Sequence, residues 1–141
     1  MTTATADRAP RLVQHLLDWQ GTWFVAQLAL CSAYLLGGVV KLTDFPAAIA
    51  EQAHFGVPMP ALFAAVTIAV ELVGPILILT DRLAWLGAGM LGMFTLLAAL
   101  VANAFWTLHG YERFAAMNAF FEHLGLIGGF VLVAIHSRRR V

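Results

Sequence analysis

The chain has 141 residues, of which 61% are apolar and only 11% are charged, and its formal net charge is zero. A soluble domain is about half apolar and about a quarter charged, so this composition indicates an integral membrane protein. Zero net charge gives no electrostatic reason to expect nucleic-acid binding. The single cysteine, Cys31, excludes an internal disulfide or a Cys-x-x-Cys redox pair, and the sequence has no cysteine- or histidine-rich spacing typical of a metal site.

The first 21 residues lack the short basic head and apolar core of a cleavable signal peptide, because charged residues and Pro10 are scattered through them. We expect residues 1–21 to form a cytoplasmic or interfacial segment. Four apolar runs follow, and each reaches about the 20 residues that cross a bilayer core as a helix. We predict membrane spans over residues 22–41, 61–80, 83–106 and 118–135.

The connections between these spans predict how the helices are arranged. A polar stretch, "TDFPAAIAEQAHFGVPMP", follows the first span, and its alternation of apolar and charged residues suits a short interfacial helix. A very short turn joins the second and third spans, which favours antiparallel neighbours. The fold class is therefore predicted as all-α, an integral membrane four-helix antiparallel bundle over residues 22–136, with a basic cytoplasmic tail at 137–141.

The basic residues predict the orientation. Cytoplasmic connections are enriched in Lys and Arg, and an even number of spans puts both termini on one side. Six of the eight basic residues then share a side, so both termini and the turn between the second and third spans are expected in the cytoplasm of a bacterial inner membrane. The six are Arg8, Arg11, Arg82, Arg138, Arg139 and Arg140, with Lys41 and Arg113 opposite.

Each predicted span carries a polar residue on the same helical face as small residues, at spacings of three or four. Polar side chains in membrane helices usually face the protein interior, and small residues let helices approach closely. This pattern predicts four inward-facing polar residues. The stripes are Gly37 and Gly38 with Lys41, Gly74 with Glu71, Gly92 and Ala99 with Asn103, and Gly125 and Gly129 with Glu122; Trp106 lies on the face of Asn103.

These residues predict a polar pocket that opens to the outer face. We expect Glu122 to face inward and His123 to face a neighbouring helix or a partner, since adjacent helical residues point about 100° apart. Glu71 is either a ligand or proton site or a neutral acid bonded between helices, and Lys41 either pairs with it or reaches to water. The candidate pocket residues are Lys41, Glu71, Asn103, Trp106, Glu122, His123 and His54, with His54 either at the pocket mouth or in a plain loop.

The order of several short motifs resembles the DoxX family of small four-helix bacterial membrane proteins. The motifs are "GGVVKLTDF", "HFGVP", "ELVGP", "NAFW" and "FFEHLGLIGGF". The family's Gly-x-x-Lys element matches Gly38 and Lys41, and its Glu-x-x-Gly element matches Glu71 and Gly74. The chain departs from the family pattern at Asn103, where many members have histidine, and at Glu122-His123, where many have Lys-Asn.

The resemblance implies a membrane subunit linked to redox complexes, with quinone as the implied ligand. Three hypotheses follow. The first is an accessory or anchor subunit that binds quinone or lipid and docks a redox protein, with a homo-oligomer as an option. The second is a quinone-linked oxidoreductase in which Glu71 and Glu122 move protons, and the third is a small proton-coupled transporter. Dedicated redox chemistry normally needs a cysteine pair, haem ligands or a nucleotide motif, which favours the first.

Overall fold

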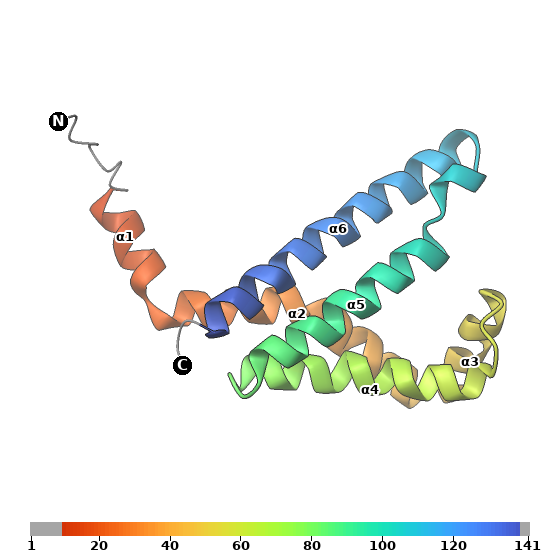
Figure 1. Ribbon diagram of the computed structural model, residues 1–141, viewed down its shortest axis with the longest axis horizontal. Coiled ribbons are helices and arrows are strands. Elements are labelled where there is room, and N and C mark those ends of the chain that lie inside the picture. Colours follow the sequence, from red (N-terminus) through yellow and green to blue (C-terminus); the bar gives the residue numbers. More distant parts are fainter. Residues whose placement is uncertain (1–9, 139–141) are drawn as a thin grey trace.

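The computed structural model describes residues 10–138, and all regular secondary structure in that range is helical (Figure 1). Four of its segments are long and apolar enough to cross a membrane, which confirms the predicted all-α membrane fold. The N-terminal residues 1–9 and residues 139–141 of the predicted basic tail lie outside the described range. The elements are α1 (Arg11–Asp18), α2 (Gln20–Thr43), α3 (Phe45–His54), α4 (Pro60–Leu79), α5 (Ala84–Ala102), the 3₁₀ helix η1 (Phe105–Thr107) and α6 (Gly110–Arg138).

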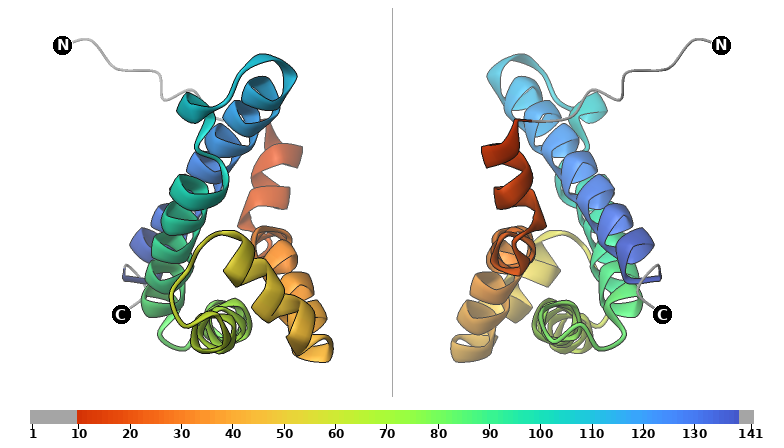
Figure 2. Two further views of the ribbon diagram at one scale, coloured as in Figure 1. Left: turned by 90° about the vertical axis from the view of Figure 1, so that its right-hand side faces the viewer. Right: turned by 90° about the vertical axis from the view of Figure 1, so that its left-hand side faces the viewer.

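The four long helices form two antiparallel pairs. α2 packs on α4, α4 packs on α5 and α5 packs on α6, whereas α2 and α6 touch over only a short length. The α2–α4 and α5–α6 pairs lie close together near the α4–α5 turn and spread apart toward α3 and η1, as Figure 1 and both views of Figure 2 show. The short helix α3 packs across α4 and α2 at the spread end, where the sequence predicts an interfacial helix.

Small residues bring α4 and α5 into close contact. A Cβ atom on Gly87 would lie 2.5 Å from the carbonyl oxygen of Gly74, and a Cβ on Gly74 would lie 2.7 Å from Cγ of Leu91. Gly74 thus lies in a close helix contact, as the sequence predicts. Gly87, which packs against the Gly74 backbone, was not among the predicted packing residues. Close approach of this kind is how membrane helices gain van der Waals contact without a hydrophobic driving force.

The interior is a narrow apolar core where all four long helices contribute. Cys31, Ile78, Leu91 and Phe130 are almost completely buried, and the Tyr34 ring meets the Phe130 ring edge-on at 5.4 Å between centroids. Most other large apolar side chains are exposed and cover the outside of the helices. Such a surface requires lipid as its solvent.

Two of the predicted spans differ from the helices of the structure. The sequence predicts a connection up to residue 117, but α6 begins at Gly110, because residues 111–117 contain no glycine or proline and include strong helix formers. The predicted third span, residues 83–106, agrees with the apolar segment Ala84–Thr107, but this segment is not one helix, because α5 ends at Ala102 and η1 follows. Asn103 therefore caps the C-terminal end of α5, so the predicted placement of Asn103 on an inward helical face is wrong.

The predicted N-terminal segment contains the amphipathic helix α1, which turns away from the axis of α2 (Figure 1). Leu12, Leu16 and Leu17 are exposed on one of its faces, while His15 and Asp18 lie on the other. The hydroxyl of Thr22 donates a 2.5 Å hydrogen bond to the carbonyl of Leu16, which ties α1 to α2. An apolar face of this kind is typical of a helix at a membrane surface.

Candidate functional site

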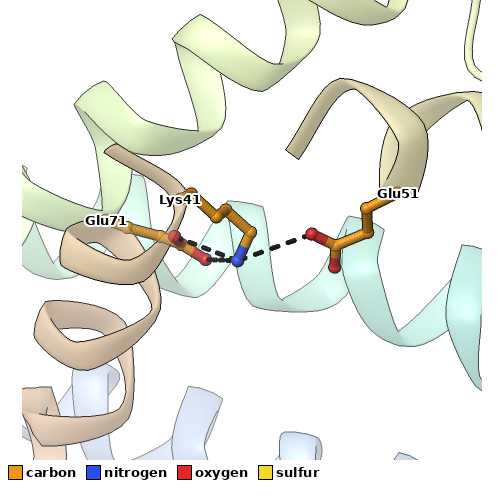
Figure 3. A network of polar contacts seen from close by, with 3 residues as sticks. All are labelled: Lys41, Glu51 and Glu71. Atoms are coloured by element: carbon orange, nitrogen blue, oxygen red, sulfur yellow. Dashed lines mark hydrogen bonds and ion pairs between the residues drawn. The ribbon is translucent and has the colours of Figure 1, made fainter. Parts of the chain in front are cut away.

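The centre of the candidate site is an ion pair between two membrane helices. Lys41 lies in the last turn of α2, and Glu71 lies in the middle of α4. The Lys41 ammonium donates to both carboxylate oxygens of Glu71, with Nζ 3.2 Å from Oε1 and 3.3 Å from Oε2 (Figure 3). Of the two uses considered for Lys41, the structure has the pairing with Glu71.

The ion pair is largely withdrawn from the surface. The side chain of Glu71 is 7% exposed and that of Lys41 is 17% exposed. An unpaired charge in a membrane span costs about 2.5–3.5 kcal/mol on insertion scales. Pairing Lys41 with Glu71 offsets much of this cost for both residues. Glu71 is therefore held between helices as an ion-paired acid in this arrangement.

A second carboxylate, which the sequence analysis missed, faces the same ammonium. Glu51 of α3 places Oε2 3.8 Å from Lys41 Nζ, and its side chain is 47% exposed (Figure 3). Glu51 shares a helical face with Ala48, which is buried against the neighbouring helices. The sequence shows only the spacing of three residues between Ala48 and Glu51, which does not indicate the helix that this face of α3 meets.

Two glycines of α2 make room for Glu71. A Cβ on Gly38 would lie 2.8 Å from Cδ2 of Leu72 and 3.1 Å from Cβ of Glu71, so α2 and α4 could not approach as closely with a larger residue there. A Cβ on Gly37 would lie 3.4 to 3.5 Å from both Glu71 carboxylate oxygens and from Lys41 Nζ. Both predicted packing glycines thus border the ion pair directly.

The remaining predicted pocket residues lie elsewhere. Asn103 and Trp106 lie at the far end of α5 and in η1, where an aromatic cluster joins η1 to α6. Trp106 is 54% exposed, and its ring lies 6.0 Å from that of Phe120. His54 ends α3, is exposed and packs its ring on Phe55. Among residues 10–138, Lys41 makes polar contacts with Glu51 and Glu71 alone.

The expected inward direction of Glu122 is wrong. Glu122 is exposed on α6, and a Cβ on Gly125 would meet nothing within 4 Å, so this stripe is not a packed face. His123 lies on the half-buried side, and its Nδ1 is 2.6 Å from the carbonyl oxygen of Ala119. Gly129 is the exception among these glycines, because a Cβ there would lie 3.0 Å from Cδ1 of Leu30 in α2.

A separate polar contact joins α2 to α5 inside the core. The hydroxyls of Tyr34 and Thr95 are 2.6 Å apart, and the Thr95 hydroxyl donates to the carbonyl of Leu91 at 2.6 Å. Because a threonine hydroxyl has one hydrogen, Tyr34 is the donor to Thr95. The side-chain amide of Gln27, also buried, lies 3.4 Å from the carbonyl of Ile78. These contacts satisfy buried polar groups and lie apart from the ion pair.

The arrangement around Lys41 can exchange hydrogen bonds with a polar group. An ammonium has three N–H donors, and two of them serve Glu71, so one remains for another acceptor. The carboxylates of Glu51 and Glu71 are acceptors with unused lone pairs. Within the described part of the chain, no three His, Cys, Asp or Glu side chains stand close enough to hold a metal ion.

Comparison with known proteins assigns the chain to a family. The sequence profile of the DoxX family matches residues 22–109. This chain belongs to the DoxX family. The matched range runs from α2 to η1, so it contains Lys41, Glu51 and Glu71 and ends before α6.

One curated relative supports the same assignment. Inner membrane protein YphA of Escherichia coli (strain K12) is 26% identical to this DoxX-family chain over 111 residues, which are 79% of each chain. No solved structure gives a significant match. The four apolar helices and this relative together support an integral inner-membrane protein.

Proposed function

We propose that this chain is an accessory membrane subunit of a redox-linked complex, and that its Lys41–Glu71 site binds the headgroup of a membrane quinone. The proposal rests on the ion pair between α2 and α4. This pair places one ammonium and two carboxylate oxygens, which can bond a ligand, within a membrane-spanning fold. A quinone carbonyl can accept the free N–H of Lys41. A quinol hydroxyl can donate to Glu71, so the same group of side chains suits both redox forms.

The local charge favours a neutral headgroup over a phosphate. Glu51 and Glu71 are two carboxylates near one ammonium, Lys41, and two acids with one base carry a net negative charge when all are ionised. An anionic lipid phosphate would be repelled by this excess. We therefore assign the site to a quinone rather than to an anionic lipid, and we place the redox chemistry itself on a partner protein.

Purification from native membranes in mild detergent tests the proposal. The quinone and the phosphatidylglycerol that remain bound per chain are measured for the wild type, Lys41→Met and Glu71→Gln. We expect quinone to stay with the wild type and to be reduced in both variants, while phosphatidylglycerol does not change. Glu122→Gln is the matched control, since this acid is exposed on α6.

Two results would contradict the proposal. Quinone at the same level in Glu71→Gln as in the wild type would exclude this site. A wild type that carries no more quinone than an unrelated membrane protein of the same preparation would exclude quinone binding. The accessory role is tested by the proteins that co-purify, and quinone reductase activity of the purified chain alone would argue for the enzyme hypothesis instead.

A further inference from the structure

Gly37 lies directly against the polar atoms of the ion pair. The three heavy atoms nearest to a Cβ built on Gly37 are Oε2 of Glu71 at 3.4 Å, Oε1 of Glu71 at 3.5 Å and Nζ of Lys41 at 3.5 Å. All three are polar atoms of the ion pair, and none belongs to α5 or α6. A side chain at position 37 would therefore lie directly over the polar atoms that a ligand needs.

The direction in which Gly37 faces follows from the register of α2. Leu30 contacts Gly129 of α6, and Gly37 lies seven residues further along, which is close to two full helical turns. Gly37 and Leu30 are thus on one face of α2. The α5–α6 pair diverges from the α2–α4 pair toward α3 and η1 (Figures 1 and 2), and Gly37 lies nearer than Leu30 to the α3 end of α2.

We propose that the headgroup reaches Lys41 and Glu71 across Gly37, from the side of α2 that faces the diverging α5–α6 pair. Gly37 is then the residue that determines which headgroups fit. This inference rests on the proposed function and adds the route of approach and the residue that limits which headgroups fit.

The three polar atoms define that class. Nζ offers a donor and the two carboxylate oxygens offer acceptors, all 3.4 to 3.5 Å from the same point, the Cβ position of residue 37. A ligand can use them through a carbonyl or hydroxyl oxygen that accepts from Nζ and, where it has a hydroxyl, through a hydrogen bond donated to Glu71. Neutral lipid-soluble carbonyl or hydroxyl compounds meet this requirement, and quinone and quinol headgroups are among them.

Substitution of Gly37 tests the route. A Cβ at 3.4 to 3.5 Å makes ordinary contact, so we expect Gly37→Ala to fold normally, and Gly37→Leu to add a side chain that covers the ion pair. Binding of decylubiquinone to the full chain in detergent is measured by equilibrium dialysis. Because one charge-assisted hydrogen bond contributes about 1.5–3 kcal/mol, we expect Gly37→Leu to weaken binding by about tenfold or more, with Gly37→Ala between it and the wild type.

The controls separate this inference from the proposed function. Gly128→Leu places the same side chain on α6 where a Cβ meets nothing within 4 Å, and it should bind decylubiquinone like the wild type. If Gly37→Ala and Gly37→Leu bind normally while Glu71→Gln does not, the route is wrong and the site stands. If Glu71→Gln also binds normally, the site itself is wrong. Should Gly37→Leu unfold, wild-type binding by a folded Gly37→Ala would overturn the route.

Discussion

Gly87 of α5 lies against the backbone carbonyl of Gly74 in α4, so closely that a Cβ on Gly87 would be 2.5 Å from that oxygen. The atom in the way is backbone and cannot rotate aside. Gly87 therefore limits how closely α4 and α5 can lie here, because the Gly74 backbone stands against it, and this contact lies where the two helical pairs meet.

Gly87→Ala should destabilise the protein. The added methyl group would push α5 away from α4, and overpacking of this kind typically costs about 1–3 kcal/mol. Thermal unfolding in detergent, followed by circular dichroism, would measure it. Gly89→Ala is the control on the same helix, because a Cβ at Gly89 meets nothing within 4 Å. Equal melting temperatures for the two variants would contradict the close contact.

Lys41 and Glu71 should depend on each other for stability. Removing one partner of a buried ion pair leaves an uncompensated charge and costs roughly 3–5 kcal/mol, whereas replacing both with apolar residues is often close to neutral. We expect Lys41→Met and Glu71→Met to be destabilised singly, and the double variant to regain most of the loss. Reversible unfolding in mixed detergent micelles measures the cycle.

Glu51→Gln is the comparison for this cycle. Its side chain is 47% exposed and lies 3.8 Å from Lys41, and such partly solvated pairs contribute little. The variant should therefore unfold like the wild type. Additive effects of Lys41→Met and Glu71→Met would show that the two charges are not coupled in the membrane protein.

Tyr34→Phe tests the polar contact in the core. The change removes the hydroxyl that donates to Thr95 and leaves the Thr95 hydroxyl bonded to the carbonyl of Leu91. No buried hydrogen-bond donor therefore loses its acceptor. Hydrogen bonds between membrane helices average about 0.6 kcal/mol, and a loss of that size is expected. The measurement is the same unfolding equilibrium. A loss greater than that of Glu71→Met would mean that Tyr34 is more important for the fold than the ion pair.

The orientation predicted from the basic residues can be checked with single cysteines. In a Cys31→Ala background, Ala53→Cys on α3 should react with a membrane-impermeant maleimide in intact cells. Asp81→Cys in the α4–α5 turn should react only after the membrane is opened. The reverse pattern would place both termini on the outer side. Cys31 itself is completely buried and should not react in either condition.

The sequence predicted the parts of the fold that depend on composition. Apolar runs locate the spans because lipid excludes charge along their whole length, and for the same reason Lys41 and Glu71 are conspicuous within them. Glu51 was missed because it lies in a connection of mixed composition, where a charge is unremarkable. Its role depends on how α3 packs on α4, and local sequence does not encode that contact.

The errors concern helical faces. The inward direction of Glu122 was inferred from Gly125 and Gly129, but glycine permits close packing and does not require it, and Gly125 borders open space. Asn103 was assigned to a face by extending the helical period past Ala102, where α5 ends. The direction of Glu122 depends on where a second helix lies, and the assignment of Asn103 depends on where α5 ends. Helical periodicity alone gives neither.

The order of Lys41 and Glu71 along the chain has a consequence for biosynthesis. α2 leaves the ribosome before α4, and Lys41 lies two residues from the end of α2, where a long side chain can reach the membrane surface without a partner. Glu71 lies in the middle of α4, where its short side chain cannot reach the membrane surface. When the insertion machinery releases α4 into the bilayer, the counter-ion for its acid is therefore already in place.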